Sequence, residues 1–163
     1  MTASQIHDAI QAHLFKGDYA YLREFRAGTG YSETSNRYLD AWAIQCFPSK
    51  PMLAIGIEVK VSRSDFNGEL RKPTKRDSAL RITNQFYFAA PYGMIKPTEI
   101  PPEAGLIEVD ANGIARITLE APHREVYGWT LPFVASLARR VQQRDRQDEA
   151  EKSRELFELG KAL

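Results

Sequence analysis

The chain of 163 residues carries 22 lysines and arginines against 21 aspartates and glutamates, which gives a formal net charge of +1 at pH 7. Its hydrophobic fraction of 43% and charged fraction of 26% are ordinary for one globular domain and exclude collagen-like, coiled-coil and disordered chains. The nearly neutral total also excludes a polycation that attracts nucleic acid over its whole surface, so any nucleic-acid surface must be local.

The apolar stretches are of strand length, and the first residues contain no apolar segment typical of a signal peptide. We therefore expect a cytoplasmic protein that does not enter a membrane. Cys46 is the only cysteine, which excludes an intramolecular disulfide and a cysteine-based zinc site. Because it lies in an apolar run, we expect its thiol to be buried.

The N-terminal pattern predicts a helix followed by a strand. Apolar residues recur through 3–16 at the spacing of one helix face. Thr2 and Gln5 fit a capping box at the start of this helix, and Gly17 fits its end. Residues 19–26 then alternate between two faces, which is typical of a strand.

Two further strands are predicted at 38–47 and 52–62, after a glycine-containing polar connection. The Pro-Ser-Lys-Pro sequence at 48–51 is a turn signal, so these two strands should pair as an antiparallel hairpin.

The next segment combines helix and strand signals. A helix should begin at Ser62 and must end or kink at Pro73, which lacks an amide donor. Thr74 and Asp77 could cap a second helical piece that ends near Ile82. The apolar run at 86–90 is typical of a buried strand.

The C-terminal part predicts a hairpin and a helix. A proline-rich loop at 95–104 precedes strands at 105–109 and 114–119, which flank an Asn-Gly pair, the strongest short hairpin signal. A helix should begin near Pro132. The apolar stripe that we expect to end the packed fold consists of Val134, Leu137, Ala138 and Val141. We therefore expect a folded domain at 1–142 and a charged helical extension or tail at 143–163.

Charged residues interrupt two of the apolar strands. Side chains at i and i+2 of a strand share a face, so Glu58 and Lys60 should project together. Asp40 lies among apolar residues of the preceding strand. Because buried unpaired charge is costly, these side chains need a bound cation or a phosphate nearby. If the hairpin makes the two strands neighbours, Asp40 and Glu58 can converge on one metal ion.

Magnesium suits this set, because it prefers oxygen ligands and is usually held by one or two carboxylates with water and phosphate. We expect Mg²⁺ or Mn²⁺ as the cofactor, with Lys60 orienting the attacking water or neutralising developing charge. The bare triplet Glu58-Val59-Lys60 is weak evidence, since such triplets usually form surface strands with ion pairs. The order of Asp40, turn, triplet and basic helix favours the metal site.

A basic segment directly follows the triplet. Its members are Arg63, Arg71, Lys72, Lys75, Arg76 and Arg81. We expect Arg63, Lys72 and Lys75, together with Arg37, to bind DNA phosphates, with a solvated helix face as the alternative. The tryptophans and tyrosines are expected to be core or rim residues, because no repeated aromatic-basic interleaving occurs.

These residues belong to a longer pattern. It consists of Asp40, EVKVSRSDF at 58–66, FYFAAP at 86–91 and GLI at 105–107. Over about residues 19–120, it resembles the MmcB-like DNA-repair branch of the PD-(D/E)XK nuclease superfamily. The resemblance implies an α/β fold with a restriction-endonuclease-like core of order αβββαβ, in which helices flank a central mixed sheet. An extra C-terminal hairpin and helix would follow this core.

The resemblance also assigns roles to residues. It implies Asp40 and Glu58 as metal-binding acids, the main-chain carbonyl of Val59 as a further ligand and Lys60 as the catalytic lysine. The superfamily has an additional acid on the first helix or strand. Glu24 is our choice for it and Glu33 is the rival.

We therefore expect a metal-dependent DNA endonuclease or nickase in DNA repair or phage-related DNA processing. The first alternative is a catalytically silent nucleic-acid-binding module of the same fold that acts with a repair partner. A third hypothesis is a structural or interaction domain, which predicts that the charges of Asp40, Glu58 and Lys60 lie paired on an exposed surface. DNA is the expected partner, and a homodimer or a complex with a repair protein is compatible with the sequence.

Overall fold

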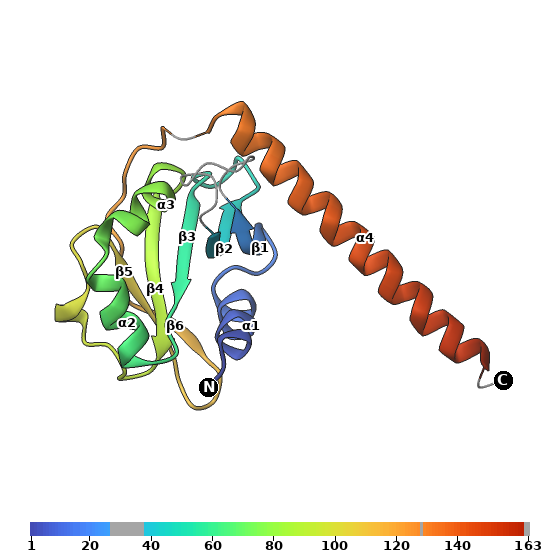
Figure 1. The fold of residues 1–163 in the computed structure, drawn as a ribbon, viewed down its shortest axis with the longest axis horizontal. Coiled ribbons are helices and arrows are strands. Elements are labelled where there is room, and N and C mark those ends of the chain that lie inside the picture. Colours follow the sequence, from blue (N-terminus) through green and yellow to red (C-terminus); the bar gives the residue numbers. More distant parts are fainter. Residues whose placement is uncertain (27–37, 128, 162–163) are drawn as a thin grey trace.

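The computed structural model describes residues 1–26, 38–127 and 129–161. Its strands form one six-stranded sheet in which they lie side by side in their order along the chain (Figure 1). The sheet is mixed, and helices pack on both of its faces, so the predicted α/β class with a mixed sheet is confirmed.

The N-terminal half contains one helix and an antiparallel three-stranded unit. Its elements are α1 (Ala3–His13), β1 (Tyr19–Arg26), β2 (Tyr38–Gln45) and β3 (Ala54–Val59). The predicted capping box between Thr2 and Gln5 is present, and Gly17 has a positive φ of 68° just after the helix. The predicted hairpin across residues 48–51 is also confirmed.

The second half adds three strands, of which β4 and β5 run parallel to β3. Its elements are α2 (Arg63–Leu70), the 3₁₀ turn η1 (Pro73–Arg76), α3 (Asp77–Arg81), β4 (Gln85–Pro91), the 3₁₀ turn η2 (Pro97–Glu99), β5 (Gly105–Val109), β6 (Ala115–Leu119) and α4 (Leu131–Lys161). Parallel neighbours need a crossover connection, and α2 with α3 forms the one between β3 and β4. The predicted Asn-Gly hairpin joins β5 and β6.

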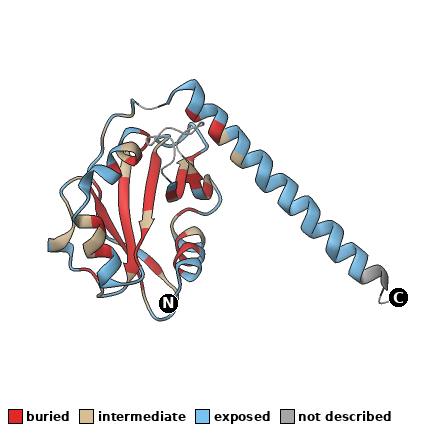
Figure 2. Cartoon of the chain, viewed as in Figure 1, coloured by how far each residue is buried: buried red, intermediate tan, exposed pale blue. Residues whose placement is uncertain are grey.

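Two apolar clusters cover the two faces of the sheet. On one face, α1 contributes Ile6 and Ile10, which pack with Ile57 of β3 and other sheet residues. On the opposite face, Phe66 of α2 packs in the cluster that contains Phe88 of β4. The central strands are therefore buried on both sides (Figure 2).

Helix α4 starts on the domain and then projects away from it as an exposed rod (Figures 1 and 2). The expected apolar stripe is wrong in three of its four positions, because Val134, Ala138 and Val141 are exposed. Phe133 is buried instead, with its ring centroid 5.7 Å from that of Trp42. The stripe is wrong in phase: the side of α4 that faces the domain includes Phe133, Ser136 and Arg140, whose guanidinium donates to the Arg23 carbonyl at 2.8 Å. Within the described ranges, no helix combines the length and the apolar character that a bilayer-spanning segment needs.

Two local predictions are also wrong. Cys46 is exposed, because β2 ends one residue earlier and the backbone amide of Cys46 turns to donate to the Asp18 carbonyl at 2.8 Å. Thr74 does not cap the second helical piece: it lies inside η1, and α3 has no side-chain cap.

Candidate metal and catalytic site

The predicted acids and lysine line one cleft of about 590 Å³ beside the C-terminal end of β3. The predicted residues in its wall are Glu24, Asp40, Glu58, Val59, Lys60 and Lys75. They come from β1, β2, β3 and η1, so the fold brings together residues that are up to 51 positions apart in the chain (75 − 24).

Asp40 reaches the cleft from the third position of β2. Its Oδ2 accepts a hydrogen bond of 2.8 Å from the backbone amide of Val59. Val59 is the last residue of β3 and lies two residues beyond Ile57, which pairs with Ala41 of β2. The carboxylate of Asp40 therefore bonds to the residue that directly follows Glu58.

Glu24 has an unusual backbone. Its φ of 51° makes it the one non-glycine residue with a positive φ among the described residues. Leu22 and Phe25 pack in the same apolar cluster although they are three positions apart, so the alternation of faces is broken at Glu24. The register of β1 with β2 puts Glu24 opposite Asp40. Such local strain persists only where surrounding packing holds it, and it often marks functional sites.

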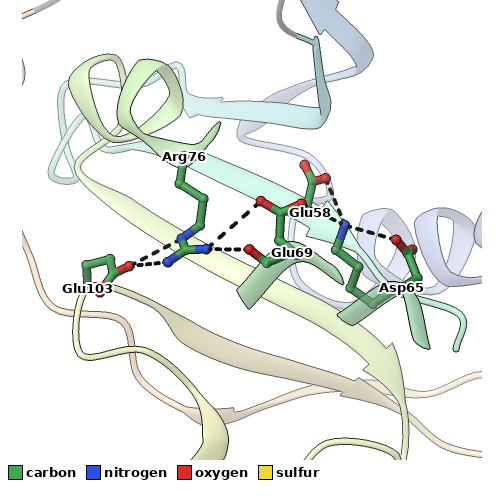
Figure 3. Close-up of polar contacts among 6 residues, drawn as sticks. Glu58, Asp65, Glu69, Arg76 and Glu103 are labelled. Carbon is green, nitrogen blue, oxygen red and sulfur yellow. Dashed lines mark hydrogen bonds and ion pairs between the residues drawn. The ribbon is translucent and has the colours of Figure 1, made fainter. Parts of the chain in front are cut away.

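Lys60 is buried, with 4% of its surface exposed, and three carboxylates surround its ammonium group. Its Nζ lies 3.1 Å from Glu58 Oε1, 3.5 Å from Glu69 Oε2 and 3.7 Å from Asp65 Oδ1 (Figure 3). Glu58 and Lys60 therefore project on the same side, as the strand period predicts. Helix α2 is capped by Ser62 rather than by Asp65, which lies in its first turn.

Sequence reasoning missed Glu69. It lies on α2, is 7% exposed, and contacts both Lys60 and the buried Arg76, at 3.9 Å between Arg76 Nη1 and Glu69 Oε1. Arg76 in turn donates to Glu103 at 2.7 Å (Figure 3). The four residues form a chain of alternating charges that runs from the buried Lys60, Glu69 and Arg76 to the partly exposed Glu103. The signal in the sequence that could have singled out Glu69 is an acidic residue inside an otherwise basic segment.

The electrostatics of the two acids are set by burial. Burial, reinforced by the Asp40 carboxylate, raises the pKa of Glu58 to about 7. Burial also raises the pKa of Asp40, although the hydrogen bond from Val59 acts in the opposite direction. Burial lowers the pKa of Lys60, but the neighbouring carboxylates outweigh this and raise it overall. Both acids are therefore harder to ionise here than in water, and a cation bound beside them would offset this cost.

This donor set fits a hard divalent cation. Asp40 and Glu58 offer carboxylate oxygens, and Val59 lines the same cleft. Among the residues that the structure describes, no group of three or more acidic, histidine or cysteine side chains could hold a metal by itself. Magnesium needs no such group, because water and substrate phosphate usually complete its shell.

The residues expected to bind DNA are dispersed. Lys75 lines the cleft, whereas Lys72 is exposed and lies outside it. Arg63 is held by Glu99, at 2.7 Å between Arg63 Nη2 and Glu99 Oε1. Arg37, and the rival acid Glu33, lie outside the described residues.

His7 of α1 is a further cleft residue that sequence reasoning did not select. It is buried, and its Nδ1 lies 2.7 Å from the hydroxyl of Tyr21. Burial, with the nearby Arg23 guanidinium, lowers the pKa of His7 to about 4. The imidazole is therefore neutral at pH 7 and contributes no cation to the cleft.

Comparison with known proteins places the fold but not the activity. No family model and no curated protein matches the chain. A solved structure of a protein of unknown function from Silicibacter pomeroyi is similar, with a TM-score of 0.63 and 22% sequence identity. The match covers 90% of this chain and 94% of that one. At this identity the likeness concerns the fold alone.

Proposed function

We propose that the chain is a metal-dependent phosphodiesterase that hydrolyses DNA, with a restriction-endonuclease-like core related to the MmcB-like branch of the PD-(D/E)XK superfamily. The observation that carries this proposal is the convergence of Asp40, Glu58 and Lys60 in one cleft, with the pKa of both acids raised. Perturbed titratable groups in a cleft are typical of catalytic sites.

The order of elements supports the same proposal. Helix α1 and strands β1 to β3 are followed by the helical crossover of α2 and α3 and then by strand β4, which corresponds to the order αβββαβ if the crossover counts as one helical unit. The strands β5 and β6 and the helix α4 come after this unit, as the resemblance implies. The two acids lie on β2 and β3, the central hairpin of that unit.

The chain's own residues would share the work as follows. Asp40 and Glu58, with the carbonyl of Val59, would hold Mg²⁺ or Mn²⁺. When bound, the ion supplies Lewis-acid activation of water and of the phosphoryl group. Lys60 places a positive charge beside Glu58, where it can orient the attacking water or neutralise charge that develops on phosphate oxygens. Lys75, in the same cleft, would neutralise a neighbouring phosphate.

The test is DNA cleavage with Mg²⁺ or Mn²⁺ and its loss in site variants. We expect the wild-type chain to nick or degrade DNA, and Asp40→Asn, Glu58→Gln or Lys60→Ala to reduce the rate at least 100-fold, as is typical of removing one catalytic group. Glu151→Gln on the exposed part of α4 is the matched control and should retain full activity. Cleavage that survives in all three site variants would refute the assignment.

One observation favours the silent binding module as a second candidate. Lys60 is already paired with Glu58, Glu69 and Asp65, so its charge is compensated within the protein. A site of this kind could persist as a structural ion-pair cluster. Salt-dependent DNA binding without cleavage on single-stranded, duplex or branched DNA would favour this module.

A further inference from the structure

A second pocket opens beside the proposed catalytic cleft, and we call it the side pocket. It has a volume of about 280 Å³ and shares Glu58, Glu69 and Lys75 with the cleft. Because three residues line both hollows, the side pocket and the cleft lie next to each other. The sequence predicted no role for the side pocket, and the similar solved structure belongs to a protein of unknown function.

The walls of the side pocket suit a flat aromatic ring. Leu39, Ala79 and Phe86 provide apolar surface, and Tyr38 stands at the edge with 61% of its surface exposed. The guanidinium of Arg26 lies over the Tyr38 ring, 6.0 Å from its centroid, and helps to orient it. This contrasts with the expectation that the tyrosines are core or rim residues without a stacking role.

The polar part of the side pocket suits the hydrogen-bonding edge of a nucleobase. Glu69 and Arg76 are both buried and line the pocket, and Ser78 adds a hydroxyl group. Pockets that hold extruded bases combine stacking walls with a few polar groups of this kind. Lys75 lines both the side pocket and the cleft, so its ammonium group is suited to the phosphate of a nucleotide whose base enters the side pocket.

Size limits the occupant. Pockets for drug-sized ligands usually measure about 300–1,000 Å³, so about 280 Å³ suits one ring system and excludes a stacked base pair. We propose that the side pocket accepts one unpaired nucleobase next to the phosphate held in the cleft, so that the preferred substrates contain an unstacked nucleotide. The inference rests on the proposed function and specifies its substrate class.

The experiment measures metal-free binding of three matched DNA duplexes by fluorescence anisotropy. One is fully paired, one carries a single unpaired nucleotide, and one carries an abasic residue at that place. The abasic duplex has the same flexible backbone, so it isolates the contribution of the base. We expect the wild-type chain to bind the duplex with the unpaired base about 5- to 140-fold more tightly than the abasic one, the gain of one stacked base.

Variants locate the gain. Tyr38→Ala and the pocket-filling Ser78→Phe should abolish the difference between base and abasic residue, whereas Tyr38→Trp should retain it. Tyr127→Ala removes another exposed tyrosine, 84% exposed against 61% for Tyr38, that lines neither hollow, and it should behave as wild type. Circular dichroism and thermal unfolding confirm that each variant is folded.

The outcomes separate the two proposals. Equal binding of the base and abasic duplexes by the wild-type chain overturns the side-pocket assignment, and so does a base-dependent gain that persists in Tyr38→Ala and Ser78→Phe. Metal-dependent cleavage is measured separately on the same DNA. If cleavage occurs without a base-dependent gain, only the side pocket is refuted. A base-dependent gain without any cleavage refutes only the nuclease.

Discussion

Removing the charge of Glu58 should stabilise the protein at alkaline pH, although we expect the same change to reduce the proposed DNA cleavage at least 100-fold. The pKa of Glu58 is raised from 4.5 to about 7, mainly because the carboxyl group is buried and lies near Asp40. The ionised carboxylate is thus less favourable in the folded chain than in the unfolded chain. Below pH 4.5 the group is protonated in both states and makes no difference. Its destabilising effect develops between pH 4.5 and 7 and is complete above pH 7.

The magnitude follows from this difference. Each tenfold change in an acid dissociation constant corresponds to about 1.4 kcal/mol, so the ionised Glu58 destabilises the fold by about 3 kcal/mol at pH 8. The raised pKa of Glu58 already includes its favourable ion pair with Lys60, so this figure is net of that pair. We expect a net stabilisation of about 1–3 kcal/mol at pH 8 and almost none at pH 4.

The assay is urea unfolding at several pH values for the wild type, Glu58→Gln and the exposed control Glu151→Gln. The free energy of unfolding of Glu58→Gln minus that of wild type should rise from pH 4 to pH 8, and the control difference should stay flat. Adding Mg²⁺ at pH 8 should stabilise the wild type by mass action but not Glu58→Gln. A Glu58→Gln variant that is less stable than wild type at pH 8 would refute the reasoning, because the local environment would then favour the ionised carboxylate.

Three further outcomes are expected. On fully paired DNA, where no base enters the side pocket, Glu69→Gln should lower the rate of cleavage by about 10- to 100-fold and change affinity little, because Glu69 then acts through Lys60. A loss of affinity for paired DNA equal to the loss of rate would contradict this. Lys75→Ala should weaken DNA binding and reduce, by about 1, the magnitude of the slope of log binding constant against log salt concentration. Lys72→Ala, outside the cleft, should have smaller effects, and equal effects of the two variants would argue against a local phosphate site. The pKa of His7 is lowered to about 4, so its stabilising effect is complete above pH 6.5 and is lost as the pH falls through 4. Between pH 7 and pH 4, the free energy of unfolding measured in urea should therefore fall by about 1–3 kcal/mol less in His7→Gln than in the wild type. Equal falls in the two proteins would contradict a buried neutral imidazole.

Local sequence signals predicted the elements well where a single physical cause determines them. The capping box of α1, the turn between β2 and β3 and the hairpin between β5 and β6 each depend on a few adjacent residues. The same holds for the shared face of Glu58 and Lys60, which follows from the strand period alone. These features need no knowledge of distant parts of the chain.

Predictions failed where the outcome depends on what the rest of the chain supplies. The apolar stripe of α4 has the correct period but the wrong phase, because Phe133, Ser136 and Arg140 face the domain and Val141 on the neighbouring side stays exposed. Cys46 lies in an apolar run, yet it is exposed because the sheet ends one residue before it. Periodicity reports which residues share a face, and only tertiary packing decides which face is covered.

The charge chain through Glu69 shows the same limit at the site itself. In the sequence, Glu69 and Arg76 lie among basic residues and are typical of a solvated helix face. In the fold they are buried, and each makes the burial of the other tolerable, because an unpaired charge at either position would be costly. If Glu58 bound a cation, as we propose, Lys60 would keep Glu69 at 3.5 Å and the more exposed Asp65 at 3.7 Å as partners, and a buried ammonium group needs such a carboxylate. Glu69, which the sequence did not single out, would thus be the buried acid that keeps Lys60 paired in the metal-bound state that we propose.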